Sequence, residues 1–236
     1  MNELNNIELE NGVQKDLEKE RNNFFDTTFG KIVDSSLNIA ISAVFPNIID
    51  DQIINIKDAI IDGGFKEGLN EIKNTGKNYK EAIEGLITGE FKSIEQMRTL
   101  VKDGGILDIV SFCIDKGLNY IESKNIVGKE ITNLIKSGKN ALINQVSTNI
   151  EKQYTGQLAH AEKLSNSCDN WKNAYENKDL ESMNKYYKQI NNQRKGIVQI
   201  ENIIKRAEEI KNIHSLVTSK GSFELSEEEV ELANKI

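Results

Sequence analysis

Apolar residues recur every three or four positions from Lys139 to Thr218, and this spacing restricts the possible folds more than any other feature of the chain. Such spacing gathers apolar side chains on one face of an α-helix. The repeat stays close to seven residues over several turns, which is typical of helices that pack as a coiled coil. A single proline in 236 residues leaves the chain nearly free of the main helix breaker. The sequence therefore predicts an all-α fold.

A polar turn at residues 176–179 divides this apolar pattern into two arms. Asn177 tolerates the left-handed conformation that ends many helices, and Asp179 is suited to cap the helix that follows. We therefore predict a long antiparallel helical hairpin over residues 138–218. Its two apolar stripes remain in register from the turn to the far end, as expected when both follow a seven-residue repeat.

The predicted hairpin fixes the positions of the two histidines of the sequence. Folding the arms about the turn places His160 opposite Lys195 and His214 opposite Ala141. The two rings would then be on the order of 25–30 Å apart, because an α-helix rises about 1.5 Å per residue. A metal ion or a catalytic base shared by both histidines is excluded in that arrangement.

Glycines punctuate the part of the chain before the hairpin. Residues 1–12 lack periodicity and are expected to be loose, whereas residues 13–137 are expected to form a bundle of short apolar helices. An apolar pair followed closely by glycine recurs, and a left-handed glycine is expected to end each helix. The glycines of these copies are Gly63, Gly89, Gly104 and Gly138. The pair Gly63-Gly64 is expected to kink or end its helix. The alternative is that the small glycines let helices approach closely or rearrange.

The last segment, residues 219–236, is acidic. Ser226 and Glu229 have the spacing of a capping box, in which each side chain bonds the backbone N–H of the other residue. This spacing predicts a short final helix. The glutamates at its start suit the positive end of the helix dipole, so capping explains them without a basic partner.

Motifs that carry catalysis, metals or nucleotides are absent from the sequence. The glycine pairs lack a phosphate-loop context, and no nucleophile elbow or EF-hand pattern occurs. Cys113 and Cys168 lie on apolar stripes and are expected to pack as small hydrophobic groups rather than form a disulfide. The net charge of −7 gives the chain no general attraction for nucleic acid. We therefore predict no enzyme activity, no cofactor and no metal site.

Aromatic residues gather near the predicted turn and form the candidate site for binding a partner: Trp171, Tyr175, Tyr186 and Tyr187. Three of them lie on the inner stripe, where packing between the helices also explains them. Tyr186 is one position off that stripe and is expected to be exposed. Trp and Tyr at an exposed tip are suited to anchor an interface.

These features favour a non-enzymatic intracellular scaffold that presents the hairpin to a protein partner or to a second copy of itself. The alternative is a membrane-active protein that uses the apolar runs 32–45 and 106–121, which core helices also explain. A nucleic-acid-associated or enzymatic role is a third, less favoured hypothesis. We expect a cytoplasmic location, because we find neither a secretion signal nor a window of roughly 18 apolar residues. The chain is rich in Asn, Ile and Lys, a composition common in proteins of A+T-rich bacterial genomes, so we expect a bacterial origin.

Overall fold

The computed structural model describes residues 27–74, 79–195 and 200–236. These residues are helical apart from turns and an isolated β-bridge between Phe91 and Ile200, which confirms the all-α class. The N-terminal segment that was expected to be loose, and the start of the expected bundle, lie outside the described residues.

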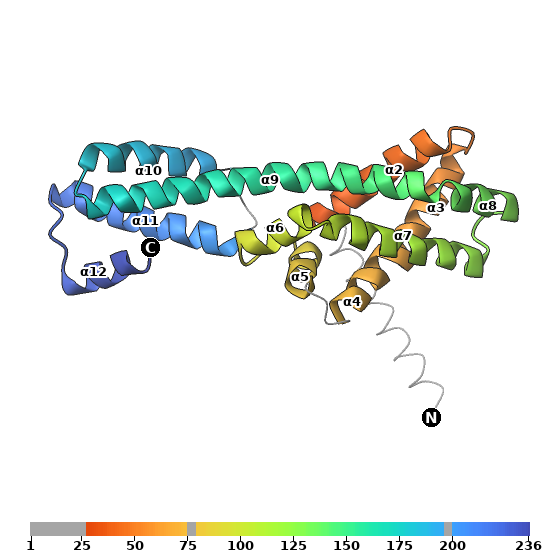
Figure 1. Cartoon of the computed structure of the whole chain (residues 1–236), viewed down its shortest axis with the longest axis horizontal. Helices are drawn as coiled ribbons and strands as arrows, with labels where there is room; N and C mark the ends of the chain where they lie inside the picture. The colour runs from red at the N-terminus through yellow and green to blue at the C-terminus, as the bar shows by residue number, and fades with distance from the viewer. Residues whose placement is uncertain (1–26, 75–78, 196–199) are drawn as a thin grey trace, which may run out of the picture. The chain divides into compact units, whose positions relative to one another are not determined.

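The described residues form two compact units, whose helices are labelled in Figure 1. The first unit is drawn from Met1–Gly89 and Thr99–Gln153, and the second from Glu90–Arg98 and Tyr154–Ile236. The division falls inside the long helix α9 (Lys139–Glu176) rather than at the predicted boundary before it. Each unit has its own buried apolar side chains and is described by itself below.

The first unit contains the short helices that were expected from the glycine punctuation, together with the start of α9. Its other elements are α2 (Thr28–Val44), α3 (Asp50–Ile60), the π-helical segment η1 (Ile61–Lys66), α4 (Glu67–Asn74), α5 (Lys80–Thr88), the end of α6 (Ile94–Lys102), α7 (Gly105–Lys124) and α8 (Lys129–Ser137). Helix α2 stops just before Pro46, since the residue before a proline is pushed out of the helical region.

The two most apolar runs of the sequence become helices α2 and α7, and both turn their apolar faces into the core of the first unit. Phe29 and Val33 of α2 are fully buried, and so are Val110 and Ile114 of α7. The Phe29 ring packs edge-on against Phe65, with 6.2 Å between the centroids. No helix of the described residues is long and apolar enough to cross a membrane.

The pair Gly63-Gly64 does not end its helix. The chain passes from α3 through η1 into α4 without a cap, and η1 packs on α7. A Cβ atom added at Gly64 would lie 2.2 Å from the carbonyl oxygen of Cys113, and one added at Gly117 would lie 2.7 Å from Cα of Ile60. The missing side chains therefore let the backbones of the two helical segments touch. We call this contact the glycine crossing.

The prediction that a left-handed glycine ends each short helix holds at two of its four positions, and at a third, Gly138, the helix ends at glycine without the left-handed conformation. Gly89 closes α5 with φ 77°, and Gly104 follows α6 with φ 74°, both in the left-handed region that glycine favours. Gly63 instead lies inside η1, and Gly138 has φ −92°. Close packing explains glycine at position 138, because an added Cβ would lie 2.5 Å from the Phe45 ring.

The second unit contains the predicted turn between two helices. Helix α9 ends at Glu176, and α10 (Leu180–Arg194) begins after Asp179, whose side chain accepts a hydrogen bond from Ser182 N at 3.0 Å. The predicted cap is therefore confirmed. The left-handed residue is Lys178, with φ 56°, rather than Asn177.

The predicted second arm is wrong beyond Arg194. Helix α10 returns along α9 close to the expected register, because His160 Nε2 lies 2.9 Å from the carbonyl oxygen of Gln193. The chain then reverses again, and α11 (Glu201–Lys220) runs beside α9 back towards the turn (Figure 1). His214 thus lies beside Trp171, near the tip, and not opposite Ala141. The second unit is an up-down-up arrangement of three helices, followed by the short helix α12 (Glu227–Asn234).

Candidate functional site

The predicted aromatic site separates into a cluster of rings, which holds Trp171, Tyr175 and Tyr187, and one ring outside it, Tyr186. Helix α9 places Trp171 and Tyr175 one turn apart, and α10 supplies Tyr187. These three rings share a cluster with two residues that the sequence interpretation did not include, His214 of α11 and Phe223. Tyr186 is not part of this cluster. Its ring instead lies under the side chain of Lys185.

The five rings make successive contacts, and we call them the aromatic ladder. Phe223 lies 6.2 Å from Tyr175, which stacks on Trp171 at 5.6 Å with an angle of 4° between the ring planes. Trp171 meets His214 edge-on at 6.2 Å, and His214 stacks on Tyr187 at 3.9 Å. Each such pair typically contributes about 0.5–1.5 kcal/mol beyond its buried area. The ladder joins α9, α10, α11 and the segment before α12.

A hydrogen bond fixes the protonation state of the histidine in the ladder. Trp171 Nε1 donates to Nδ1 of His214 at 3.2 Å, and both residues are buried. An indole N–H can only donate, so Nδ1 must carry a free lone pair and the proton of the neutral ring must be on Nε2. Burial lowers the pKa of the His214 imidazole, because a charged ring loses its hydration there.

Tyr186 lies outside the ladder but is partly exposed, as are the ladder residues Tyr175, Tyr187 and Phe223. It is half-buried on α10, and Lys185 Nζ lies 5.4 Å from its ring centroid. A cation above an aromatic face is attracted by the ring quadrupole. Of the predicted site residues, Trp171 has no exposed surface, whereas Tyr175, Tyr186 and Tyr187 are each partly exposed.

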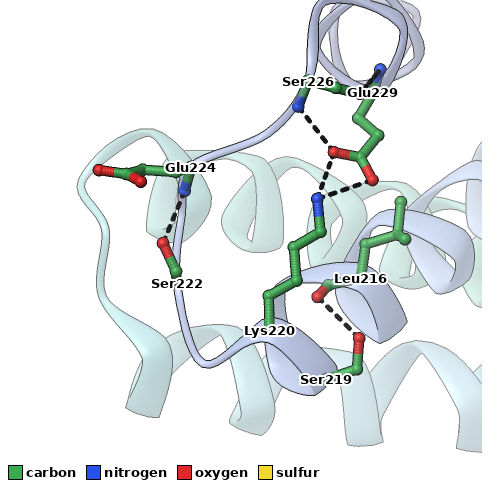
Figure 2. Close-up of polar contacts among 7 residues, drawn as sticks. All are labelled: Leu216, Ser219, Lys220, Ser222, Glu224, Ser226 and Glu229. Carbon is green, nitrogen blue, oxygen red and sulfur yellow. Dashed lines mark hydrogen bonds and ion pairs between the residues drawn. The ribbon is translucent and has the colours of Figure 1, made fainter.

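The segment after α11 is fastened beside the ladder by polar contacts, which Figure 2 shows. Ser226 and Glu229 form the predicted capping box, with Ser226 N donating to Glu229 at 2.7 Å. Lys220 Nζ, at the end of α11, donates to both carboxylate oxygens of Glu229 at 2.6 and 2.9 Å. These contacts, chiefly the hydrogen bond from Lys220, lower the pKa of Glu229. They hold the start of α12 close to the end of α11, and Phe223 lies between the two helices.

The cysteines and the second histidine, which are the other side chains suited to catalysis or metal binding, are also engaged in internal contacts. Cys113 and Cys168 are free thiols with no exposed surface. Burial raises the pKa of Cys168 to about 11 and also raises that of Cys113, so neither forms the reactive thiolate near neutral pH. His160 is held by the Gln193 carbonyl. Among the described residues, no group of three or more His, Cys, Asp or Glu side chains is placed to hold a metal ion.

Comparison with known proteins found no matching family model, no matching curated protein and no matching solved structure. The geometry of the ladder is therefore the starting point for a functional hypothesis.

The sequence carried a signal for one of the two residues that were missed. His214 continues an apolar stripe with Ile210 and Val217, at spacings of four and three. Its burial could be read from that pattern, but its neighbours could not, because they depend on the second chain reversal. Phe223 follows the end of α11 outside any periodic pattern, so no local signal placed it against Tyr175.

Proposed function

We propose that the chain is a non-enzymatic, helical interaction protein that binds a protein partner or a second copy of itself through the tip of its second unit. The observation that carries this proposal is the environment of Tyr186. Its half-exposed ring lies on α10 next to Tyr187, which is stacked into the ladder. The helix that presents Tyr186 is thus held by the ladder, and a pre-organised aromatic group loses little freedom when it binds.

The environments of the histidines and cysteines support a role without catalysis. The Nδ1 lone pair of His214 is used by Trp171, and His160 is bonded to a backbone carbonyl. A general base needs a lone pair within reach of substrate, and a nucleophilic cysteine needs a lowered pKa. The two free, buried thiols also fit the cytoplasm, where disulfides are rare.

The experiment compares Tyr186→Ala with a matched control, Leu134→Ala. Leu134 is an exposed apolar residue of α8 in the first unit, so its removal alters exposed apolar surface without changing the second unit. Self-association is measured by sedimentation equilibrium, and partner binding by pull-down with the full chain as bait. We expect Tyr186→Ala alone to weaken binding by about tenfold, which corresponds to about 1.4 kcal/mol. Equal binding by both variants and the wild type would contradict the proposal.

The membrane-active alternative is supported by exposed isoleucines in the first unit. Three isoleucines have about half of their surface or more exposed: Ile39 of α2 at 54%, Ile49 just before α3 at 63% and Ile54 of α3 at 49%. Apolar side chains of this kind favour attachment to a bilayer surface when they lie on one face. Flotation of the full chain with anionic liposomes at neutral and mildly acidic pH tests this alternative. The absence of bound protein at both pH values would exclude it.

A further inference from the structure

The surroundings of His214 suit a neutral imidazole. Trp171 directs an N–H group at Nδ1 of His214. A proton added at Nδ1 would occupy the lone pair that accepts this hydrogen bond, and two N–H donors would then face each other. Tyr187 stacks on a face of the His214 ring, with 3.9 Å between the centroids, and His214 is almost completely buried. Protonation would therefore break the bond to Trp171 and place a charge where water is excluded.

Two carboxylates of the neighbouring helices are engaged with other cations. Asp169 of α9 pairs with Arg206 at 2.7 Å, and Glu229 of α12 pairs with Lys220. From α10 the titratable group that faces the imidazole is Tyr187.

The remaining titratable group of the ladder is Tyr175, whose pKa is raised, mainly by burial and also by the charge of Glu229. It lies beyond Trp171 as seen from the imidazole and is neutral at mildly acidic pH. Stacking of a cation on Tyr187 offsets only part of the cost of charging His214, because the ring still loses its hydration and its hydrogen bond.

We propose that protonation of His214 at mildly acidic pH is a switch that releases α11 from α9 and α10 and uncovers the aromatic ladder. The inference goes beyond the proposed function and does not rest on a partner being bound. It is carried by the position of the ring, since His214 contacts both Trp171 of α9 and Tyr187 of α10. If the His214 ring left this position, α11 would lose its contacts with Trp171 of α9 and Tyr187 of α10.

The direction of the pH effect follows from linkage. Burial lowers the pKa of folded His214 below the ordinary value of about 6.5, so the open form binds more protons as the pH falls through this range. Stability from the neutral ring is fully present above about pH 6.5 and is lost as the pH falls towards the folded pKa. The opening equilibrium then shifts by at most about tenfold for each pH unit, since one proton is involved.

The test uses urea unfolding of the full chain between about pH 7.5 and pH 5, a range in which the ordinary histidine titrates. Trp171, the sole tryptophan of the sequence, reports on the ladder by its fluorescence. The wild type is compared with His214→Phe, which keeps an aromatic ring but cannot be charged, and with His160→Gln, which removes the other histidine. We expect the wild type and His160→Gln to lose stability towards pH 5, and His214→Phe to be almost insensitive. Equal pH dependence in the wild type and His214→Phe would overturn the proposal.

A second measurement uses the wild-type chain alone, so it tests the proposal even if His214→Phe fails to fold. Proton NMR follows the His214 ring and the single indole N–H of Trp171 through the same titration. We expect His214 to titrate below about pH 6.5, with loss of the hydrogen-bonded indole signal at the same midpoint. Titration of His214 with an unchanged indole signal would show that the charged ring is accommodated, and the switch would be rejected.

Discussion

The two units bring helices together by opposite means. In the first, the glycine crossing removes side chains so that backbones touch, with only 2.2 Å left between a hypothetical Cβ of Gly64 and the carbonyl oxygen of Cys113. In the second, the aromatic ladder fills the space between helices with large rings around Trp171 and His214. The first arrangement therefore tolerates no added atom, and the second tolerates no lost ring.

The two arrangements should also respond differently to acid. Both histidines of the sequence belong to the second unit, and one of them is part of its core. Histidine is the side chain whose ordinary charge change falls between pH 5 and 8. We therefore expect the glycine crossing to be indifferent to mild acid and the aromatic ladder to weaken.

The largest effect is expected from Trp171→Ala. This change removes the centre of the ladder and leaves the buried Nδ1 of His214 without its donor. We expect a loss of about 3–5 kcal/mol in the free energy of unfolding, measured by urea denaturation and far-ultraviolet circular dichroism. Trp171→Phe retains a ring and should lose clearly less. Similar losses in both variants would indicate that stacking does not hold the second unit together.

Gly64→Ala should have the next largest effect, because its new methyl group would collide with the Cys113 carbonyl, a backbone atom that cannot rotate away. We expect a loss of about 3 kcal/mol, at the upper end of the usual range for overpacked cores. Gly63→Ala is the matched variant, since its methyl group would meet the half-buried Tyr120 side chain. Its loss in the same denaturation assay should be smaller. The reverse order would argue against direct backbone contact at the crossing.

Ser226→Ala should have a smaller and local effect. It removes the capping hydrogen bond to Glu229 N, which typically contributes about 1 kcal/mol. Because Lys220 still holds Glu229, we expect faster hydrogen exchange in α12 while α9 and α10 remain protected. Ser215→Ala, at an exposed position of α11, serves as the control. Faster exchange throughout the second unit would mean that α12 is needed for the ladder itself.

Gly156→Ala should produce the smallest change, and one of opposite sign. Gly156 is an exposed residue of α9, and an added Cβ would meet nothing within 4 Å. Alanine is favoured over glycine inside a helix by about 0.8–1 kcal/mol, so thermal unfolding should move to higher temperature. A destabilised variant would show that glycine has a packing role in the second unit too, and the contrast with Gly64 would be lost.

Features set by neighbouring residues were predictable from the sequence. The all-α class, the turn after Glu176, the Asp179 cap and the capping box of Ser226 all depend on side chains within a few positions of one another. Local hydrogen bonds and apolar periodicity determine such features, so they leave a readable pattern.

The second chain reversal was not predicted, because the apolar spacing is the same on both sides of it. Ile190, Ile197 and Ile204 are seven residues apart, as they would be in one continuous helix. The available signal was the polar run 191–196, which ends in glycine. Missing that signal placed His214 at the wrong end of the hairpin and hid its contact with Trp171.

Close approach of helices at the glycines was the less favoured of two interpretations of the sequence, for a different reason. A glycine pair inside an apolar stripe usually signals a helix end, and its role in close packing depends on which helix lies opposite. Gly64 faces Cys113, which is 49 positions away along the chain, so no local pattern distinguishes the two roles.

Hydrogen exchange of the full chain at pH 7 and pH 5 tests the contrast between the units most directly. Labelling times are scaled for the intrinsic exchange rate at each pH, and α7 of the first unit is compared with α11 of the second. We predict that α7 keeps its protection and that α11 loses about tenfold, as expected when one buried proton site favours the open form. Unchanged protection in α11, or an equal loss in both helices, would contradict the account.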